Sequence, residues 1–283
     1  MSRHEQQTPG KDPRFDGVRD TWYWKASKPL RVVVHFFIRM KNAYIHYGGL
    51  KGMWKRFLQK KFEGKKRITF GTASFPTEAQ KKLERETKFS KDIKISILVP
   101  LFNTPEKFLR EMIDSVQYQT YGNWELCLAD GSDDKHPEVG QIVAEYMKND
   151  PRIKYQKIEK NLGISGNTNI CFGMATGDYI GLFDHDDILH PSVLFEYVKA
   201  INEQGADYLY CDETTFQSGD INHMLTMHFK PDYAPDNLRA NNYICHFSVF
   251  KRTLLEDTEL FRSKFDGSQD HDMILRLTYR AKK

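Results

Sequence analysis

The sequence lacks closely spaced cysteines. This spacing gives no sign of a CxxC redox or metal motif and bears on the compartment that we expect for the protein. Its four cysteines, Cys127, Cys171, Cys211 and Cys245, lie 34 to 44 residues apart, and no CxxC pair occurs. Each lies in an apolar or strand-like stretch of the chain. We therefore expect buried free thiols in a reducing cytosol.

The sequence also lacks a membrane-spanning segment. A transmembrane helix needs about 20 consecutive apolar residues, and the best run, residues 32–38, is too short and has a histidine in its middle. Residues 1–24 are polar and charge-balanced, unlike a secretory signal. They show no periodicity and predict a flexible leader. We expect a protein that does not cross the membrane.

Two glycine-rich phosphate-binding motifs are absent as well. Neither GxGxxG nor GxxxxGKS/T occurs in the chain, so the common glycine-rich phosphate loops are excluded. If the chain binds a nucleotide diphosphate, its charge has to be neutralised in another way. Carboxylates that hold Mg²⁺ or Mn²⁺ are one such way.

Charge is present but unevenly distributed. The net charge of the 283 residues is +4, yet residues 25–67 contain thirteen Lys or Arg and a single acid, Glu63. That segment has a net charge of +12, which leaves −8 for the rest of the chain. A basic arm on an acidic body favours an anionic surface as a partner.

The basic segment has the pattern of two helices, over residues 29–47 and around residues 53–62, with Gly48 and Gly49 between them. Five apolar residues form one stripe of the second helix: Met53, Trp54, Phe57, Leu58 and Phe62. Such a segment either binds an anionic membrane surface through residues 25–67 or packs on the main domain with its basic face in water. The aromatic residues form a stripe rather than a stacking platform, so we expect no nucleic-acid partner. We assign residues 25–90 to this segment and a linker.

Residues 91–283 alternate between strand and helix patterns, which predicts an α/β fold with a mainly parallel sheet flanked by helices. The apolar strand-like runs are residues 93–100, 124–129, 153–158, 179–183, 206–211 and 244–250. The helix-like stretches are residues 105–119, 138–149, 165–175, 191–202 and a last one from Asp270. Residues 222–229 are weakly patterned, and a loop there would carry His223 and His228.

Three carboxylates follow the fourth strand-like run in the sequence Asp184-His185-Asp186-Asp187. Like charges packed together repel one another, and a divalent cation held by oxygen ligands is the usual compensation. Polar residues also follow the first three strand-like runs: Asn103 and Thr104, then Asp130, Ser132, Asp133 and Asp134, then Asn161. Because an open α/β sheet binds ligands at the carboxyl ends of its strands, we expect these loops to converge on one crevice. Ser132 and Asp133 are alternatively helix caps.

These motifs occur together in an order that resembles a known family. The carrying segments are residues 95–103 (ISILVPLFN), 124–132 (WELCLADGS), 161–165 (NLGIS), 184–187 (DHDD) and 267–272 (GSQDHD). From about Lys94 to its end the chain resembles the family 2 glycosyltransferases, inverting enzymes with the GT-A fold that build bacterial surface polysaccharides. The resemblance covers about two thirds of the chain, and its specificity comes from the ordered set of motifs.

The resemblance implies roles for particular residues. Asp270 would be the general base that removes a proton from the acceptor hydroxyl, and Asp130 would accept a hydrogen bond from a uracil or thymine ring. Asp186 would be the main ligand of Mn²⁺ or Mg²⁺, with Asp184 as the second metal ligand. The implied donor-binding residues are Pro100, Phe102, Asn103, Asp130, Asn161, Asn169, Asp184 and His185, and the acceptor-side residues are Asn242, His246 and Gln269. His185 is alternatively structural, and His246 is alternatively a packed strand histidine.

The chain departs from the common form of the family at two places. Gln269 stands before the base where many relatives have Glu, and the sequence ends thirteen residues after Asp270. Relatives often continue into a segment that covers the acceptor and supplies a histidine to the metal. Either the chain is a truncated fragment or its acceptor side is unusually open.

The resemblance implies a metal-dependent inverting glycosyltransferase that moves a sugar from UDP or dTDP to a hydroxyl of a growing, lipid-linked glycan. We expect it in the cytoplasm, peripheral at the inner face of the cell membrane, with the basic segment at the lipid surface. The alternative is a non-catalytic nucleotide-sugar-binding or assembly subunit of a polysaccharide-synthesis complex. Retention of both Asp186 and Asp270 argues against that alternative.

Overall fold

The described part of the chain is the region that we expect to form the main domain. In the computed structural model, the described residues are 75–217, 220–256 and 258–283. The predicted leader and most of the predicted basic segment lie outside these residues, so both stay predictions. No helix among the described residues is long and apolar enough to span a membrane.

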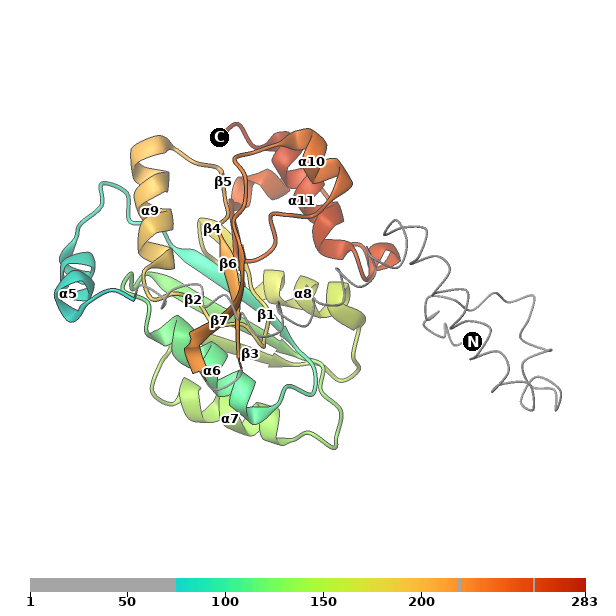
Figure 1. Cartoon of the computed structure of the whole chain (residues 1–283). Coiled ribbons are helices and arrows are strands. Elements are labelled where there is room, and N and C mark those ends of the chain that lie inside the picture. The colour runs from blue at the N-terminus through green and yellow to red at the C-terminus, as the bar shows by residue number, and fades with distance from the viewer. Residues whose placement is uncertain (1–74, 218–219, 257) are drawn as a thin grey trace, which may run out of the picture. The chain divides into compact units, whose positions relative to one another are not determined.

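A six-stranded sheet forms the centre of the fold, in the order β3-β2-β1-β4-β8-β5 (Figure 1). Its strands are β1 (Ile95–Leu101), β2 (Trp124–Asp130), β3 (Ile153–Lys157), β4 (Tyr179–Leu182), β5 (Tyr208–Leu209) and β8 (Ser248–Lys251). Strands β1 to β4 are parallel, whereas β8 pairs antiparallel with both β4 and β5. The predicted α/β class with a mainly parallel sheet is confirmed.

Helices cover both faces of this sheet, because alternate residues of a strand point to opposite faces. The core on one face joins Ile95, Ile97 and Val99 of β1 to apolar residues of three helices: α6 (Glu106–Gln117), α7 (Glu138–Met147) and α9 (Val193–Gln204). The core on the other face joins Leu98 to α8 (Gly163–Met174) and α11 (Gln269–Arg280). A further helix, α5 (Glu78–Glu86), precedes the sheet.

The structure corrects the prediction between β5 and β8. The expected loop at residues 222–229 is wrong, because β6 (Glu213–Gln217) and β7 (Asp220–His228) pair as a separate antiparallel hairpin (Figure 1). A bulge between Thr215 and Gln217 interrupts the ladder, and a bulge breaks the two-residue period that identifies a strand in sequence. The short helix α10 (Pro235–Ala240) was likewise not predicted.

Candidate active site

The acidic run after β4 forms a tight turn that separates its three carboxylates. The N–H of Asp187 donates to the carbonyl of Asp184 at 3.4 Å, and Asp186 is exposed. Asp184 and Asp187 instead face His246, whose Nδ1 lies 3.5 Å from Oδ2 of Asp184 and 4.0 Å from Oδ2 of Asp187. One ligand atom from each of these three side chains lies within 4.8 Å of the others.

The electrostatics of this group favour a bound cation. Burial raises the pKa of Asp184, and the charges of Asp186 and Asp270 add to the rise while His246 opposes it. Burial likewise raises the pKa of Asp187 to about 6, against the opposing effect of His246. Such shifts mean that the charged form of each carboxylate is disfavoured, first by its burial and then by the neighbouring carboxylates, so a cation bound between them would stabilise the charged forms.

The side chains present fit a divalent metal ion. Carboxylate oxygens suit Mg²⁺ and Mn²⁺, and a neutral imidazole nitrogen is a frequent ligand of transition metals. The set Asp184, Asp187 and His246 therefore suits Mn²⁺ well. The sequence predicted Asp184 and Asp186 as ligands; the structure brings Asp184 into the group and leaves Asp186 in solvent beside it.

Asp270 lies in the first turn of α11, and two side chains hold one of its oxygens. Its Oδ2 accepts hydrogen bonds from Nδ2 of Asn242 at 2.8 Å and from Sγ of Cys245 at 2.7 Å. No described residue bonds to Oδ1 of Asp270, so that oxygen is available to accept a proton. In the described part of the chain, the side chain of Gln269 forms no hydrogen bond with Asp270, and its Oε1 accepts the N–H of Gly267 at 2.8 Å.

Asp184 of the acidic turn and Asp270 line one small cavity of about 50 Å³, at the carboxyl ends of β1 and β4. Its lining includes Pro100, Asp184, His246, Gln269 and Asp270. His246 also borders a second cavity of about 470 Å³, together with Asp187. Five residues predicted from distant parts of the sequence thus meet in one place.

The loops after β1, β2 and β3 contact one another beside this cavity. The N–H of Asn103 donates to Oγ of Ser132 at 2.8 Å, and Asn103 takes a left-handed φ of 50°, which Asn tolerates better than most residues. Next to Ser132, a Cβ on Gly131 would lie 2.7 Å from Nδ2 of Asn167 and 3.2 Å from Oδ1 of Asn161. Any larger residue at position 131 would force the side chains of Asn167 and Asn161 to move. Phe102 is 46% exposed at their edge.

Asp130 lies beneath these loops with both carboxylate oxygens bonded inside the protein. Oδ1 accepts the N–H of Ser132 at 2.8 Å, and Oδ2 accepts the hydroxyl of Tyr155 at 2.7 Å and lies 3.2 Å from Nζ of Lys157. Burial alone would raise the pKa of Asp130, but these hydrogen bonds outweigh it and lower the pKa. Its side chain is 1% exposed, so its predicted contact with a nucleobase stays a prediction.

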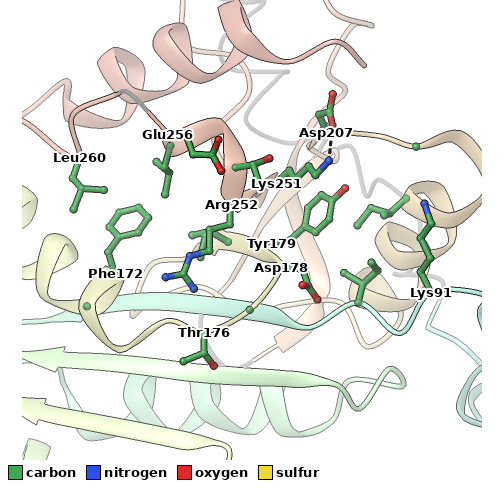
Figure 2. Close-up of a pocket in the computed structure, with 18 of the residues that line it drawn as sticks. Lys91, Phe172, Thr176, Asp178, Tyr179, Asp207, Lys251, Arg252, Glu256 and Leu260 are labelled. Atoms are coloured by element: carbon green, nitrogen blue, oxygen red, sulfur yellow. Dashed lines mark ion pairs between the residues drawn. The ribbon is translucent and has the colours of Figure 1, made fainter.

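Asn169, an expected donor residue, lines a different cavity from Asp184 and Asp270. Its amide exchanges two hydrogen bonds with the backbone of Phe261, at 2.9 and 3.0 Å. It lines a larger cavity of about 1040 Å³, where Thr176, Asp178 and Arg252 also lie (Figure 2). Asp178 and Thr176 precede β4, so this cavity lies toward the amino end of that strand, away from the acidic turn.

Sequence reasoning missed two members of the site. Asp187 was part of the acidic run but received no role, although its spacing of three residues from Asp184 suits a turn that puts both on one side. Cys245 was expected to be a buried thiol without function; all four cysteines are free, but Cys211 and Cys245 are only partly buried. The contact of Cys245 with Asp270 joins residues far apart in sequence, and no local pattern indicates it.

Comparison with known proteins identifies the family of the chain. The family model described as Glycosyl transferase family 2 matches residues 96–258. A protein of Sinorhizobium fredii called uncharacterized protein y4gI is 41% identical over 188 residues, which are 66% of this chain and 20% of that protein. The O-antigen biosynthesis protein RfbC of Myxococcus xanthus is 33% identical over 196 residues, 69% of this chain and 15% of that protein. The chain thus spans a fifth or less of the length of both relatives.

Solved structures share the fold. A crystal structure of TarS from S. aureus matches with a TM-score of 0.56 at 22% identity, over 68% of this chain and 57% of that chain. The complex of TarS with UDP-GlcNAc matches with a TM-score of 0.54 at 22% identity, over 68% of this chain and 55% of that chain. This likeness, at such identities, concerns the fold, and it confirms the predicted GT-A architecture.

Proposed function

Because the chain belongs to glycosyl transferase family 2, we propose that it is a metal-dependent inverting glycosyltransferase of cell-surface polysaccharide synthesis. It moves a sugar from UDP or dTDP to a hydroxyl of a growing glycan. The observation that carries the proposal is the cavity that Asp184, His246 and Asp270 line together at the carboxyl ends of the parallel strands. The similarity to an O-antigen biosynthesis protein supports a surface polysaccharide as the product.

In this mechanism Asp270 is the general base. Its Oδ1 takes the proton of the acceptor hydroxyl while the hydroxyl oxygen attacks the anomeric carbon from the face opposite the nucleotide. One attack from that face inverts the configuration, and no covalent intermediate with the enzyme is needed. An aspartate is a weak base, so we expect proton transfer to accompany bond formation. Asn242 and Cys245 orient the carboxylate through Oδ2.

In this proposal the acidic turn would contribute ligands to a divalent cation, which would supply positive charge for the donor diphosphate. Asp184, Asp187 and His246 would hold Mn²⁺ or Mg²⁺, and the exposed Asp186 would lie at its edge. When bound, the ion offsets negative charge on the departing nucleotide diphosphate. Pro100, Phe102, Asn103 and Asn161 lie in or beside the loops at this edge of the sheet and are the proposed donor contacts, together with His185.

The proposed setting is the cytoplasmic face of the cell membrane, where a lipid-linked glycan is the acceptor. Residues 25–67 supply the contact with anionic lipid through their net charge of +12. The acidic remainder of the chain contains the site.

A donor screen followed by one substitution tests the proposal. We expect UDP- or dTDP-sugars with Mn²⁺ to raise the melting temperature of the protein, and the matching donor to release nucleotide faster with an acceptor present. Asp270→Asn should lower turnover by about 100-fold or more while donor affinity changes little. Asp236→Asn is the matched control, because that carboxylate is 95% exposed and pairs only with Arg239 among the described residues.

Two outcomes would contradict the proposal. Near-normal turnover in Asp270→Asn would show that another group is the base. Donor binding by the wild-type protein without transfer to any acceptor would favour the alternative, a non-catalytic nucleotide-sugar-binding or assembly subunit.

A further inference from the structure

Lys230 is a buried cation next to the proposed active site. It lies two residues after β7, and its side chain is 1% exposed. An ammonium group removed from water needs negative partners close by. Nζ lies 3.2 Å from Oε2 of Glu213 and donates to three backbone carbonyls, those of Ile244 at 3.2 Å, Cys245 at 2.5 Å and His246 at 2.6 Å. One charged atom therefore gathers three consecutive carbonyls of a single segment.

Glu213 also binds the backbone of this segment, at a different atom. It is the first residue of β6, and its Oε2 also accepts the N–H of His246 at 3.0 Å. Its other oxygen, Oε1, lies 2.8 Å from Nδ1 of His228, the residue that pairs with Glu213 across the hairpin. The open end of the hairpin is thereby tied to residues 244–246 by one carboxylate and one ammonium group.

Residues 244–246 contribute one side chain to the proposed base and one to the candidate cation group. Cys245 donates its thiol to Oδ2 of Asp270 at 2.7 Å, on the side of the base. His246 places Nδ1 3.5 Å from Asp184, on the side of the cation group. A shift of the backbone at residues 244–246 would move both side chains at once.

We propose that Lys230 and Glu213 are positioning residues of the transfer reaction, which hold residues 244–246 so that His246 faces the acidic turn and Cys245 orients the base. This inference rests on the proposed function. It assigns a structural role to the end of the hairpin β6–β7, which holds the backbone of residues 244–246 in place. The two residues act through His246 and Cys245. Partners that orient metal ligands in this way typically change metal affinity or activity by about 10- to 100-fold when removed.

The test uses Lys230→Met in the full chain, since methionine keeps most of the volume and removes the charge. We expect Mn²⁺ affinity, measured by electron paramagnetic resonance without donor, to fall by about 10-fold or more. Amide hydrogen exchange should become faster in peptides that cover residues 242–248. Turnover should fall more than the KM for the donor rises, and Lys230→Arg should recover part of each loss.

Lys251→Met is the matched control. Lys251 ends β8, its side chain is 46% exposed, and it pairs with Asp207 at 3.9 Å beside the remote cavity of Figure 2. We expect Mn²⁺ affinity and the exchange of residues 242–248 to stay at wild-type values in this variant. If Lys230 only stabilised the fold, Lys230→Met would lower the melting temperature while the Mn²⁺ affinity of the folded protein stayed at the wild-type value.

A folded Lys230→Met protein with wild-type Mn²⁺ affinity and wild-type exchange at residues 242–248 would overturn the proposal. If Lys230→Met does not fold, Glu213→Gln replaces it, because the amide keeps the shape and can still accept the N–H of His246. The same two measurements then decide. If the wild-type protein binds Mn²⁺ but transfers no sugar, the proposed function fails, whereas metal affinity and exchange still test the positioning role.

Discussion

The two carboxylates that follow His185 differ in what surrounds them. Asp187 lies with Asp184 and His246 in the candidate cation group, whereas Asp186 is exposed. We expect Asp187→Asn to weaken Mn²⁺ binding by about 10-fold or more. Asp186→Asn should weaken it less. Paramagnetic resonance titrations of the two variants in parallel make the comparison. Equal losses would mean that Asp186 reaches the ion as the sequence motif predicts.

Mn²⁺ binding should depend on pH because of Asp187. Its pKa is raised to about 6, chiefly by burial, and a metal must displace any proton that the carboxyl carries. Below about pH 6 the metal-free carboxyl is protonated, so affinity should fall as the pH drops from 7 to 5. Titrations of the wild-type protein across this range measure the slope. In Asp187→Asn the slope should be shallower.

Cys245 should matter for rate through its bond to Asp270. Removing a hydrogen bond worth about 1 kcal/mol corresponds to about a five-fold change in turnover. We therefore expect Cys245→Ala to lower kcat by about five-fold and Cys245→Ser to retain more activity, since its hydroxyl can donate to Oδ2. Cys127→Ala is the control, because Cys127 is a buried thiol of β2 in the core on the other side of the sheet from α6. Equal kcat values for Cys245→Ala and Cys127→Ala would contradict this role.

The sequence could propose Asp184, because it opens an acidic run directly after a predicted strand, and it could propose Asp270 through the resemblance to the family. It could not identify Cys245, Lys230 or Glu213. Their roles arise from contacts between segments more than ten residues apart, such as the bond from Lys230 to the carbonyl of His246 at 2.6 Å. A backbone carbonyl is present at every residue, so no residue pattern marks the one that a lysine will bind.

At the scale of elements, the parallel strands were predictable and the hairpin was not. Residues of β1, β2 and β4 are buried on both faces, so they appear as mainly apolar runs, interrupted only by Ser96 and Glu125 before their polar ends. The residues of β6 and β7 are all partly or fully exposed, and polar and apolar side chains share both faces. A strand that buries neither face leaves little hydrophobic pattern to detect.

Glu125 of β2 links several elements through a carboxylate that is 2% exposed. It forms ion pairs with Lys94 at 2.6 Å and Lys154 at 2.9 Å and accepts the hydroxyl of Ser96 at 2.7 Å. Burial alone would raise its pKa, but hydrogen bonds from Lys94, from the backbone of Thr176 and from Ser96 outweigh it and lower the pKa to about 2. The charged form therefore stabilises the native state at neutral pH.

Glu125→Gln should lower the free energy of unfolding by about 2–3 kcal/mol at pH 7, as expected for a lost charged hydrogen-bond partner. A lowered carboxyl pKa gives stability that is present above the unfolded-state value and is lost as the pH falls toward 2. The difference between wild type and variant should therefore shrink below about pH 4.5, which urea denaturation at several pH values measures. Glu145→Gln is the control, because Glu145 is 56% exposed and its pair with Arg110 should contribute about 0.5 kcal/mol or less.

At the scale of the whole molecule, the opposite charges of the two parts of the sequence lead to a prediction of how the chain would bind an anionic membrane. Residues 25–67 have a net charge of +12 and the remainder −8. An anionic lipid surface repels the remainder, including the acidic turn of the site, and attracts the basic segment. The sequence therefore predicts binding through one part of the chain only, with an affinity that falls as salt screens the charges.

Neutralising five basic residues tests this in the full chain. Each well-placed basic residue contributes about 1 kcal/mol near an anionic surface, so we expect at least about 100-fold weaker binding to phosphatidylserine vesicles in sedimentation assays. The residues changed to Gln are Lys51, Lys55, Arg56, Lys60 and Lys61. The control changes five exposed lysines elsewhere to Gln: Lys82, Lys88, Lys135, Lys148 and Lys160. Both variants lose the same net charge, so an equal loss of binding would show that overall charge, rather than the basic segment, governs the association.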